Sequence, residues 1–310
     1  MVKRAGRNLI SISDLADADL EFILDRGVEL STKQPRRQLG PLEGAVVGIY
    51  FRKTSTRTRT AFSSGALRLG AHTIAFGPDD LQTVTGESVA DTAHVMAGMI
   101  DILVARTAGS PEELRQLGAH EQMPVVNAMS SAEHPTQALA DLTTLRARFG
   151  TLRGRRILYV GEGNNTAASL ALALSRFEGV ELELRTPPGY GLDEATLARA
   201  RDNCLRSSAS VRERHDMAEL PHGVDVVYTT RWQTTGTTKS DADWRTTFRP
   251  FRVESELWET SSDALFMHDL PAHREDEVSA EVLDGPASIA FEQAWNKMYS
   301  AMAVLEWCRS

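Results

Sequence analysis

A run of hydroxyl and guanidinium side chains follows a short apolar segment early in the chain. The residues from Phe51 to Phe62 are Phe-Arg-Lys-Thr-Ser-Thr-Arg-Thr-Arg-Thr-Ala-Phe. The preceding run Ala45–Tyr50 is apolar and rich in β-branched residues, which predicts a buried strand. Downstream, apolar residues recur at helical spacing as far as Leu69, and Gly70 stands where such a helix would end. The polar run therefore lies in a turn between a strand and a helix.

This strand-to-helix turn has the chemistry of an anion site. Its residues Ser55, Thr56, Arg57, Thr58 and Arg59 supply three hydroxyl groups and two guanidinium groups. The start of a helix offers unpaired N–H groups and the positive end of the helix dipole. Hydroxyls and an arginine fork add charge-assisted contacts to a phosphate or carboxylate. The alternative is a capped helix with a solvated basic first turn, but cations oppose the dipole there, which favours a bound anion.

Two more polar groups follow predicted strands. Arg106 comes directly after the predicted strand Ile102–Ala105. The sequence His-Pro-Thr-Gln at His134–Gln137 follows the predicted strand Pro124–Ala128, and its proline suits the first turn of the next helix. Strands that alternate with helices predict an open parallel sheet, in which ligands gather at the carboxyl ends of the strands. We therefore expect these groups and the strand-to-helix turn to form one site.

The second half of the chain predicts a similar unit after a turn at Gly150–Gly154. The strand Arg156–Val160 ends in Gly-Glu-Gly-Asn-Asn-Thr, but Thr166 occupies the third glycine position of a dinucleotide fingerprint, so the match fails. Further strands are expected at Glu181–Arg185, Asp225–Thr229 and Ala264–His268, followed in the last two cases by the polar segments Thr230–Gly236 and Asp269–His273. A long helix is expected to end the chain.

The alternation of strands and helices predicts the α/β class, and the length predicts two domains. At 310 residues it suits two cores of about 150 residues each. We expect two doubly wound parallel-sheet domains, residues 1–149 and 150–290, joined by long interdomain helices, with the C-terminal helix 291–310 packed back on the first domain. The net charge of −8 argues against a nucleic-acid or anionic-membrane binder.

Cysteines, metal ligands and apolar segments exclude other classes. The two cysteines, Cys204 and Cys308, are far apart and fit neither a disulfide framework nor a metal site, which favours a reducing cytoplasmic location. No signal peptide or membrane-spanning segment is expected. Neither a metal nor an organic cofactor is predicted, and a phosphate-binding loop of the Gly-x-x-x-x-Gly-Lys-Ser/Thr type is missing from the sequence.

Four segments, in order, resemble the aspartate and ornithine carbamoyltransferase family over nearly the whole chain. They are Ser-Thr-Arg-Thr-Arg at Ser55–Arg59, His-Pro-Thr-Gln at His134–Gln137, Gly-Glu-Gly-Asn-Asn at Gly161–Asn165 and His-x-Leu-Pro at His268–Pro271. The resemblance implies two α/β domains, and transfer of the carbamoyl group of carbamoyl phosphate to an amine. It also implies trimers or multiples of trimers with sites at subunit interfaces, and no cofactor.

The resemblance further implies roles for individual residues. Carbamoyl phosphate would be held by Ser55, Thr56, Arg57, Thr58, Arg106, His134, Gln137, Leu270 and Lys297. Of these, Arg106, His134 and Thr58 would be catalytic, as donors aimed at the carbonyl oxygen where negative charge grows. Gln137 and the backbone carbonyl of Leu270 would face the carbamoyl nitrogen. The departing phosphate is itself a base, so no side-chain base is required.

The residues implied for the acceptor depart from both branches of the family. Asn165 matches the ornithine branch, whereas Arg231 and Gln233 resemble the carboxylate-binding pair of the aspartate branch. Asp269 replaces the cysteine or proline of His-Cys-Leu-Pro or His-Pro-Leu-Pro, and near the C-terminus a lysine, residue 297, replaces arginine. Arg231 and Gln233 would bind one carboxylate of the acceptor, and Asp269 would bind an ammonium group. Together they predict a diamino-acid acceptor of the 2,3-diaminopropionate or ornithine type. Alternatively, Asp269 only pairs with Arg231 or His273.

Two other functions stay open at this point. The acceptor could be aspartate, since the Arg231 segment resembles that branch. The chain could also be a non-catalytic sensor of carbamoyl phosphate or phosphate, which would use the same anion site without turnover.

Overall fold

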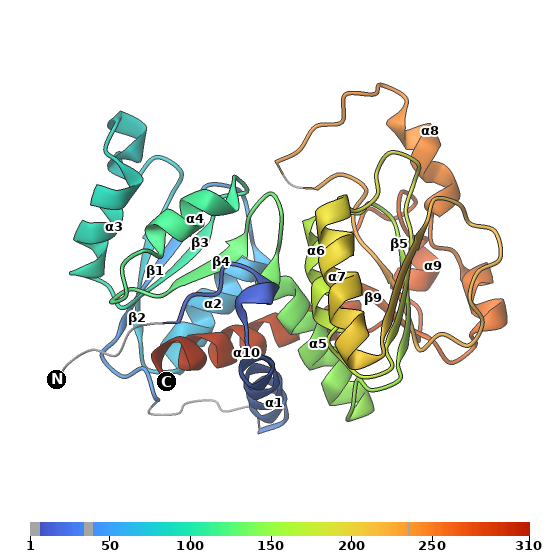
Figure 1. Ribbon diagram of the computed structural model, residues 1–310, viewed down its shortest axis with the longest axis horizontal. Helices are drawn as coiled ribbons and strands as arrows, with labels where there is room; N and C mark the ends of the chain where they lie inside the picture. Colours follow the sequence, from blue (N-terminus) through green and yellow to red (C-terminus); the bar gives the residue numbers. More distant parts are fainter. Residues whose placement is uncertain (1–6, 34–39, 235) are drawn as a thin grey trace. The chain divides into compact units, whose positions relative to one another are not determined.

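The computed structural model describes residues 7–33, 40–234 and 236–310 (Figure 1). Thr235, within the expected segment Thr230–Gly236, and the first six residues of the expected first domain lie outside the described residues. The described chain divides into two compact units. One runs to Ala147 and includes Trp295–Ser310, and the other is Arg148–Ala294.

The first unit is built on a parallel sheet with the strand order β2-β1-β3-β4. Its elements are η1 (Ile12–Asp14), α1 (Asp17–Lys33), β1 (Val46–Phe51), α2 (Arg57–Arg68), β2 (His72–Phe76), η2 (Gln82–Thr85), α3 (Val89–Ala97), β3 (Ile102–Arg106), α4 (Pro111–Leu117), β4 (Val125–Met129) and α5 (Pro135–Phe149). In Figure 1, α3 and α4 lie on one side of this sheet and α2 on the other. Helices on both faces explain why β1, β3 and β4 are almost continuously apolar.

The second unit is built on a parallel sheet with the order β7-β6-β5-β8-β9. Its elements are β5 (Arg156–Val160), α6 (Asn165–Leu174), β6 (Glu181–Arg185), α7 (Glu194–Ser207), β7 (Ser210–Arg214), β8 (Val226–Thr229), α8 (Trp244–Phe248), η3 (Arg249–Phe251), η4 (Ser255–Thr260), β9 (Leu265–His268) and α9 (Ala280–Leu283). The last helix, α10 (Ala290–Arg309), begins in the second unit and ends in the first. In Figure 1, α6 and α7 lie on one side of the sheet and α9 on the other.

The expected fold class is confirmed, with two parallel-sheet α/β units. The strands β5 and β6 have the predicted bounds, and β1 lies within one residue of its prediction. The sequence did not predict α4, α7 or β7. The strand β7 is an edge strand of sequence Ser-Val-Arg-Glu-Arg, too polar to be recognised by its hydrophobicity.

The sequence Ser-Ile-Ser-Asp-Leu predicts a capped amphipathic helix over Ser11–Leu30, and the structure corrects where this helix begins. Ser11 and Asp14 do form a capping box, but it closes only the single turn η1, and α1 begins at Asp17. The reason lies outside this segment. Ser11 Oγ donates to Glu133 Oε1 at 2.6 Å and the Ile12 amide donates to Glu133 Oε2 at 3.0 Å, which fixes the turn against the loop before α5.

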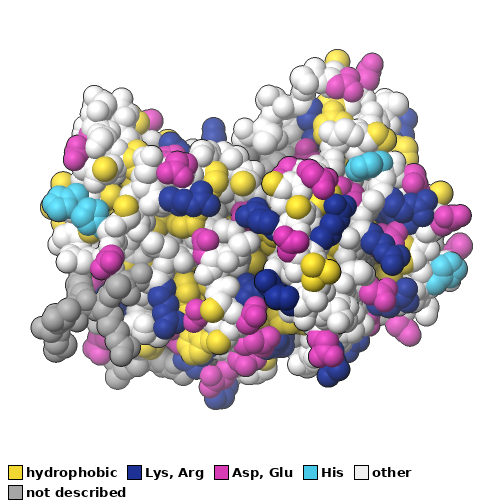
Figure 2. All heavy atoms as spheres, viewed as in Figure 1, with side chains coloured by type: hydrophobic (Ala, Val, Ile, Leu, Met, Phe, Trp, Pro, Cys, Tyr) yellow, Lys and Arg dark blue, Asp and Glu magenta, His cyan; other side chains and the backbone are white. Residues whose placement is uncertain are grey.

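Two observations bear on membranes and nucleic acids. Within the described ranges, no helix is long and apolar enough to cross a membrane. On the face shown in Figure 2, basic side chains are interspersed with acidic ones.

Candidate active site

The predicted residues of the first unit follow three neighbouring strands. Phe51 pairs with Arg106 across β1 and β3, and the Arg52 amide continues the ladder by donating to the Arg106 carbonyl at 3.0 Å. The next strand in the sheet, β4, leads through a short loop to His134. The carboxyl ends of β1, β3 and β4 therefore adjoin one another, as the ligand-binding edge of an open parallel sheet does.

The strand-to-helix turn leaves the start of α2 without a side-chain cap. Thr56 precedes the helix with helical dihedral angles (φ −74°, ψ −58°), and its side chain makes no capping hydrogen bond. Thr58 is buried in the first turn. The Thr56 hydroxyl thus caps none of the first N–H groups of α2, which suits an anion.

Arg59 serves the fold. Its guanidinium group lies 5.3 Å from the centre of the Phe51 ring and its Nη2 is 3.5 Å from the Phe51 carbonyl oxygen. Of the two arginines that the sequence associates with an anion, one is therefore explained by a stacking contact inside the first unit. The anion argument now depends on Arg57 and the helix start.

His134 is buried beside two cations. Its Nε2 lies 3.5 Å from Arg106 Nη1, and its Nδ1 lies 3.3 Å from Thr136 Oγ1. Burial lowers the pKa of His134 well below its usual value, and the positive charges of Arg106 and Lys297 lower it further. The imidazole is therefore neutral at neutral pH.

The neutral imidazole can present either tautomer. An arginine only donates hydrogen bonds, so Nε2 accepts from Arg106 only in the tautomer that carries its proton on Nδ1. The Thr136 hydroxyl both donates and accepts, so it supports a proton on Nδ1 or on Nε2. With the proton on Nε2, His134 can donate to a ligand oxygen.

The amide of Gln137 is fixed in orientation. Its Nε2 donates to Asp141 Oδ1 at 2.7 Å, and both side chains are buried. Its Oε1 is also buried and accepts no hydrogen bond within the described residues. Since the carboxylate only accepts, it selects the rotamer that turns Oε1 away from it, ready to accept from an N–H group. The sequence did not single out Asp141.

The predicted residues of the second unit also follow adjoining strands. Val160 pairs with Thr229, which pairs with His268, so the ends of β5, β8 and β9 adjoin one another. The turn after β5 needs glycine at Gly163, because a Cβ there would lie 2.3 Å from the Gly191 carbonyl carbon.

Asn164 caps the start of α6. Its side-chain oxygen accepts from the amides of Thr166 and Ala167 at 3.0 and 3.1 Å, and its Nδ2 donates to the hydroxyls of Thr230 and Thr234, both at 3.1 Å. Asn165 is the first helical residue and is buried. Asparagine at this cap position was a signal available in the sequence.

Asp269 has a hydroxyl partner and no cationic one in the described part of the chain. Thr166 Oγ1 donates to Asp269 Oδ2 at 3.1 Å, and the carboxylate side chain is 18% exposed. His268 Nδ1 lies 3.5 Å from Oδ1, but Nδ1 accepts the Leu270 N–H at 2.8 Å and so carries no proton toward the carboxylate. The expected alternative, an ion pair of Asp269 with Arg231 or His273, does not occur among the described residues.

Leu270 follows with left-handed backbone angles. Its φ is +53°, a conformation that a non-glycine residue adopts only when its surroundings hold it. The hydrogen bond from its N–H to His268 supplies part of that hold, and His268 Nε2 is in turn 3.1 Å from the buried carboxylate of Glu277.

Arg231 and Gln233 lie in the loop that follows β8, here called the β8 loop (residues 230–234 and 236–243). Arg231 Nε donates to the Gln233 carbonyl at 2.6 Å, and Gln233 Nε2 donates to the Thr237 carbonyl at 2.8 Å. These contacts leave the two terminal nitrogens of the guanidinium group for a ligand. The sequence missed Lys239 in the same loop, whose buried side chain forms an ion pair with Glu162.

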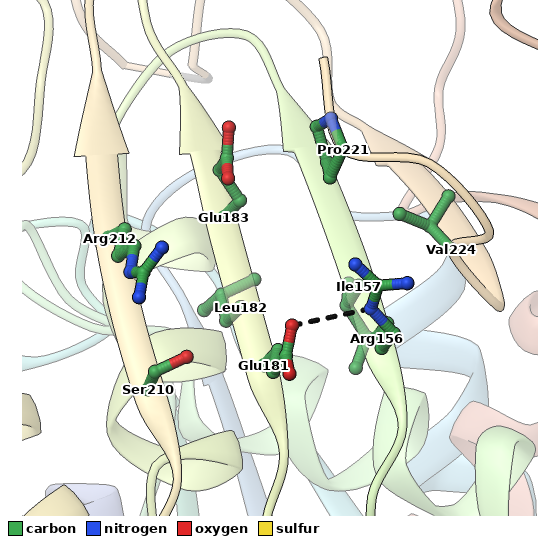
Figure 3. Close-up of a pocket in the computed structure, with 9 residues that line it drawn as sticks. All are labelled: Arg156, Ile157, Glu181, Leu182, Glu183, Ser210, Arg212, Pro221 and Val224. Atoms are coloured by element: carbon green, nitrogen blue, oxygen red, sulfur yellow. Dashed lines mark hydrogen bonds and ion pairs between the residues drawn. The ribbon is translucent and has the colours of Figure 1, made fainter. Parts of the chain in front are cut away.

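A hollow lies at the amino ends of β5, β6 and β7, and it is not a candidate for the functional site. Arg156, Glu181 and Ser210 begin β5, β6 and β7 and line it (Figure 3). Its volume of about 30 Å³ has room for one or two water molecules, and an ion pair of 3.3 Å between Arg156 and Glu181 crosses it.

No metal centre is present in the part of the chain that the structure describes, where no three histidine, cysteine, aspartate or glutamate residues are placed to hold an ion.

Comparisons with known proteins match both units. Residues 7–147 match the family model for "Aspartate/ornithine carbamoyltransferase, carbamoyl-P binding domain", and residues 153–308 match the model for its "Asp/Orn binding domain". The chain is 36% identical over 302 residues to the ornithine carbamoyltransferase of Carboxydothermus hydrogenoformans, which covers 97% of this chain and 96% of the relative. It is 38% identical over 310 residues to that of Symbiobacterium thermophilum, covering 98% of each.

Solved structures agree with these matches. The ornithine carbamoyltransferase of Pyrococcus furiosus superposes with a TM-score of 0.91 at 35% identity, over 100% of this chain and 99% of the other. That of Thermus thermophilus gives 0.85 at 32% identity, over 98% and 99%.

The neutral state of His134 predicts a pH dependence of stability. Because the unfolded chain takes up a proton near pH 6.5 that folded His134 refuses, the free energy of unfolding falls as the pH drops below about 6.5. Between pH 7.5 and 5.5 this amounts to about 1.4 kcal/mol. When denaturant unfolding is measured at both pH values, the free energy of unfolding of His134→Gln should fall by about 1.4 kcal/mol less than that of the parent.

The exposed His72 provides the control. His72→Gln should keep the pH dependence of the parent. A loss that is the same in the parent and in His134→Gln would show that His134 is not held neutral.

Proposed function

The chain belongs to the aspartate/ornithine carbamoyltransferase family and is a carbamoyltransferase, and from this premise we propose that its acceptor is a diamino acid. The product would be a ureido amino acid and the second product phosphate. The diamino acid would be ornithine or a shorter one such as 2,3-diaminopropionate. The observation that carries the proposal is the carboxylate of Asp269, which has no cationic partner among the described residues.

We assign the binding of carbamoyl phosphate to residues of the first unit. Ser55, Thr56, Arg57 and Thr58 bind the phosphate with the uncapped amides of α2. Arg106 and His134 donate to the carbonyl oxygen, Lys297 adds positive charge, and Gln137 Oε1 accepts from the carbamoyl nitrogen. The buried, fixed Gln137 amide supports the last role.

The transfer itself requires little proton chemistry from the protein. A neutral amine forms a bond to the carbonyl carbon, and the bond from that carbon to the phosphate oxygen breaks. The amine loses a proton to the departing phosphate. The side chains contribute by stabilising the negative carbonyl oxygen and by fixing the two reactants, which lowers the barrier by up to about 7–11 kcal/mol through positioning.

We assign the acceptor's polar groups to three places in the second unit. Arg231 and Gln233 bind its carboxylate, and Asn165 at the start of α6 assists. Asp269 binds its ammonium group, in addition to the hydroxyl of Thr166. The relatives named above are ornithine carbamoyltransferases, which supports an acceptor with a second amine.

We also propose that the chain assembles into a homotrimer, or a multiple of trimers, in the cytoplasm. Strands of parallel sheets are normally buried on both faces, yet the edge strand β2 has the pattern exposed, intermediate, exposed, exposed, intermediate. Large apolar side chains are exposed nearby in sequence, with Ile74 44%, Val84 57%, Val95 50% and Met99 72% exposed. Such a set is typical of a surface that a second copy covers.

The acceptor is tested with a panel of amino acids and carbamoyl phosphate, measuring ureido product. We expect the highest kcat/KM with a diamino acid, and the chain length of the best one identifies the substrate. Activity with aspartate equal to or above that with every diamino acid would overturn the proposal. No turnover with any amine, together with thermal stabilisation by carbamoyl phosphate, would identify a sensor instead.

Asp269→Asn tests the ammonium partner. Losing one charge-assisted hydrogen bond of about 1.5–3 kcal/mol should lower kcat/KM for the diamino acid by about 10- to 100-fold. The KM for carbamoyl phosphate should change by less than about twofold. The control is Asp263→Asn, an exposed carboxylate just before β9. Unchanged acceptor kinetics in Asp269→Asn would remove this residue from the site.

The oligomer is tested by light scattering after size-exclusion chromatography. The parent should have about three times, or a multiple of three times, the 34.1 kDa of one chain. The double variant Ile74→Glu with Met99→Glu should shift toward the single-chain mass, because a buried carboxylate without a partner is costly. Leu205→Glu, at an 85% exposed site on α7, is the control and should not dissociate. A monomeric parent would contradict the proposal.

A further inference from the structure

The β8 loop is held by a buried lysine. The side chain of Lys239 is only 4% exposed, and its ammonium group forms an ion pair with Glu162. The ammonium also lies 4.6 Å from the ring centre of Phe248, 4.7 Å from that of Tyr190 and 5.3 Å from that of Trp244. Cations within about 6 Å of aromatic faces are attracted by the π-electrons, and lysine is rarely buried so fully unless it is paired. One carboxylate and three rings therefore form a site for an alkylammonium group.

The three rings around the ammonium group contact one another through Phe248 and are here called the aromatic box (Tyr190, Trp244 and Phe248). Trp244 and Phe248 are the first and last residues of α8, and their ring centres are 5.3 Å apart at 88°. The ring centres of Tyr190 and Phe248 are 4.8 Å apart at 66°. Edge-to-face contacts of this kind stabilise the box itself. The backbone of Tyr190 is tied to the turn after β5, because its carbonyl accepts the Gly163 N–H at 2.7 Å.

Glu162 connects the lysine to the first part of the β8 loop. While one carboxylate oxygen meets Lys239, the other accepts a hydrogen bond from Thr234 Oγ1 at 3.2 Å. The same Thr234 hydroxyl accepts from Asn164 Nδ2 at 3.1 Å. The turn after β5 thus holds the loop at Thr230, Thr234 and Lys239, and of these contacts only the one with the lysine is ionic.

Hydrogen bonds connect Thr234 to the proposed acceptor-binding side chains of Arg231 and Gln233. The Thr237 amide donates to the Thr234 carbonyl at 3.1 Å, and the Thr237 carbonyl accepts from Gln233 Nε2 at 2.8 Å. The Gln233 carbonyl in turn accepts from Arg231 Nε at 2.6 Å. A continuous set of hydrogen bonds therefore runs from the fixed segment to the guanidinium group of Arg231.

We propose that Lys239 is a positioning residue for the acceptor. Its ammonium group, held by Glu162 in the aromatic box, keeps the β8 loop in the conformation that presents Arg231 and Gln233 to the acceptor carboxylate. The proposal rests on the proposed function for those two side chains.

The first test measures hydrogen–deuterium exchange of the ligand-free protein. Lys239→Ala should raise amide exchange in peptides covering residues 230–243 at least tenfold. n-Propylammonium replaces the three carbons and the nitrogen that the substitution removes, so it should bind the empty box and restore slow exchange. Lys239→Met keeps the alkyl volume without the charge. It should exchange fast and should not respond to n-propylammonium, because its side chain fills the space.

The second test compares KM with kcat. In Lys239→Ala the acceptor KM should rise at least tenfold, with a smaller change in kcat and a carbamoyl phosphate KM within twofold of the parent. n-Propylammonium should lower the acceptor KM of Lys239→Ala and leave the parent unaffected. Lys33→Ala is the control, because Lys33 also forms an ion pair with a glutamate, Glu29, but its side chain is 66% exposed. It should match the parent in both tests.

The outcomes separate this inference from the proposed function. If the parent carbamoylates no amino acid, the proposed function fails, while the exchange of Lys239→Ala still decides whether the lysine holds the loop. If exchange in residues 230–243 is the same in Lys239→Ala and the parent, the inference is overturned whatever the activity. The inference is also overturned if amide exchange in the loop rises in Lys239→Ala while the acceptor KM of this active variant stays within twofold of the parent value.

Discussion

Burial of positive charge next to a neutral imidazole is the interaction on which the first unit depends. Arg106 and Lys297 are both more than nine-tenths buried, and both lower the pKa of His134. Protonating His134 would add a third positive charge to a region of low dielectric, so the imidazole stays neutral and keeps a hydrogen to donate. A set of buried donors with excess positive charge is complementary to an acyl phosphate, whose carbonyl oxygen gains negative charge during transfer.

The second unit has negative charges at its strand ends, and two carboxylates there can be compared with each other. Two carboxylates, Glu162 and Asp269, follow β5 and β9, the two strands on either side of β8. Glu162 is neutralised within the chain by Lys239, and that pair serves the shape of the β8 loop. Asp269 receives a threonine hydroxyl and faces the lone pair of His268. The chain thus satisfies one carboxylate by itself, and the other is the one suited to an external cation.

The sequence allowed the parallel sheets and the strand ends to be predicted because buried strands are apolar runs. Arg106 was placed at a strand end for that reason, and it is the last residue of β3. The roles of Asp141 and Lys239 depend on three-dimensional packing. Lys239 meets a glutamate 77 residues away and rings from two other segments, a set that no local pattern contains. Arg59 shows the converse, since its charge suggested an anion while its stacking on Phe51 depends on how the chain turns after β1.

The sign of the charge at Asp269 is also the reason that we propose a diamino acid, rather than aspartate, as the acceptor. A second carboxylate about 4 Å from Asp269 would be repelled by roughly 4 kcal/mol at an effective dielectric constant near 20, and an ammonium group would be attracted by as much. The side chain is 18% exposed, so solvent reduces both values, but it reduces them together and the preference keeps its sign. In the proposed site, Arg231 and Gln233 bind the α-carboxylate of either amino acid, so they do not discriminate. Discrimination then falls to the group at the other end of the acceptor, where a carboxylate of the protein favours an amine.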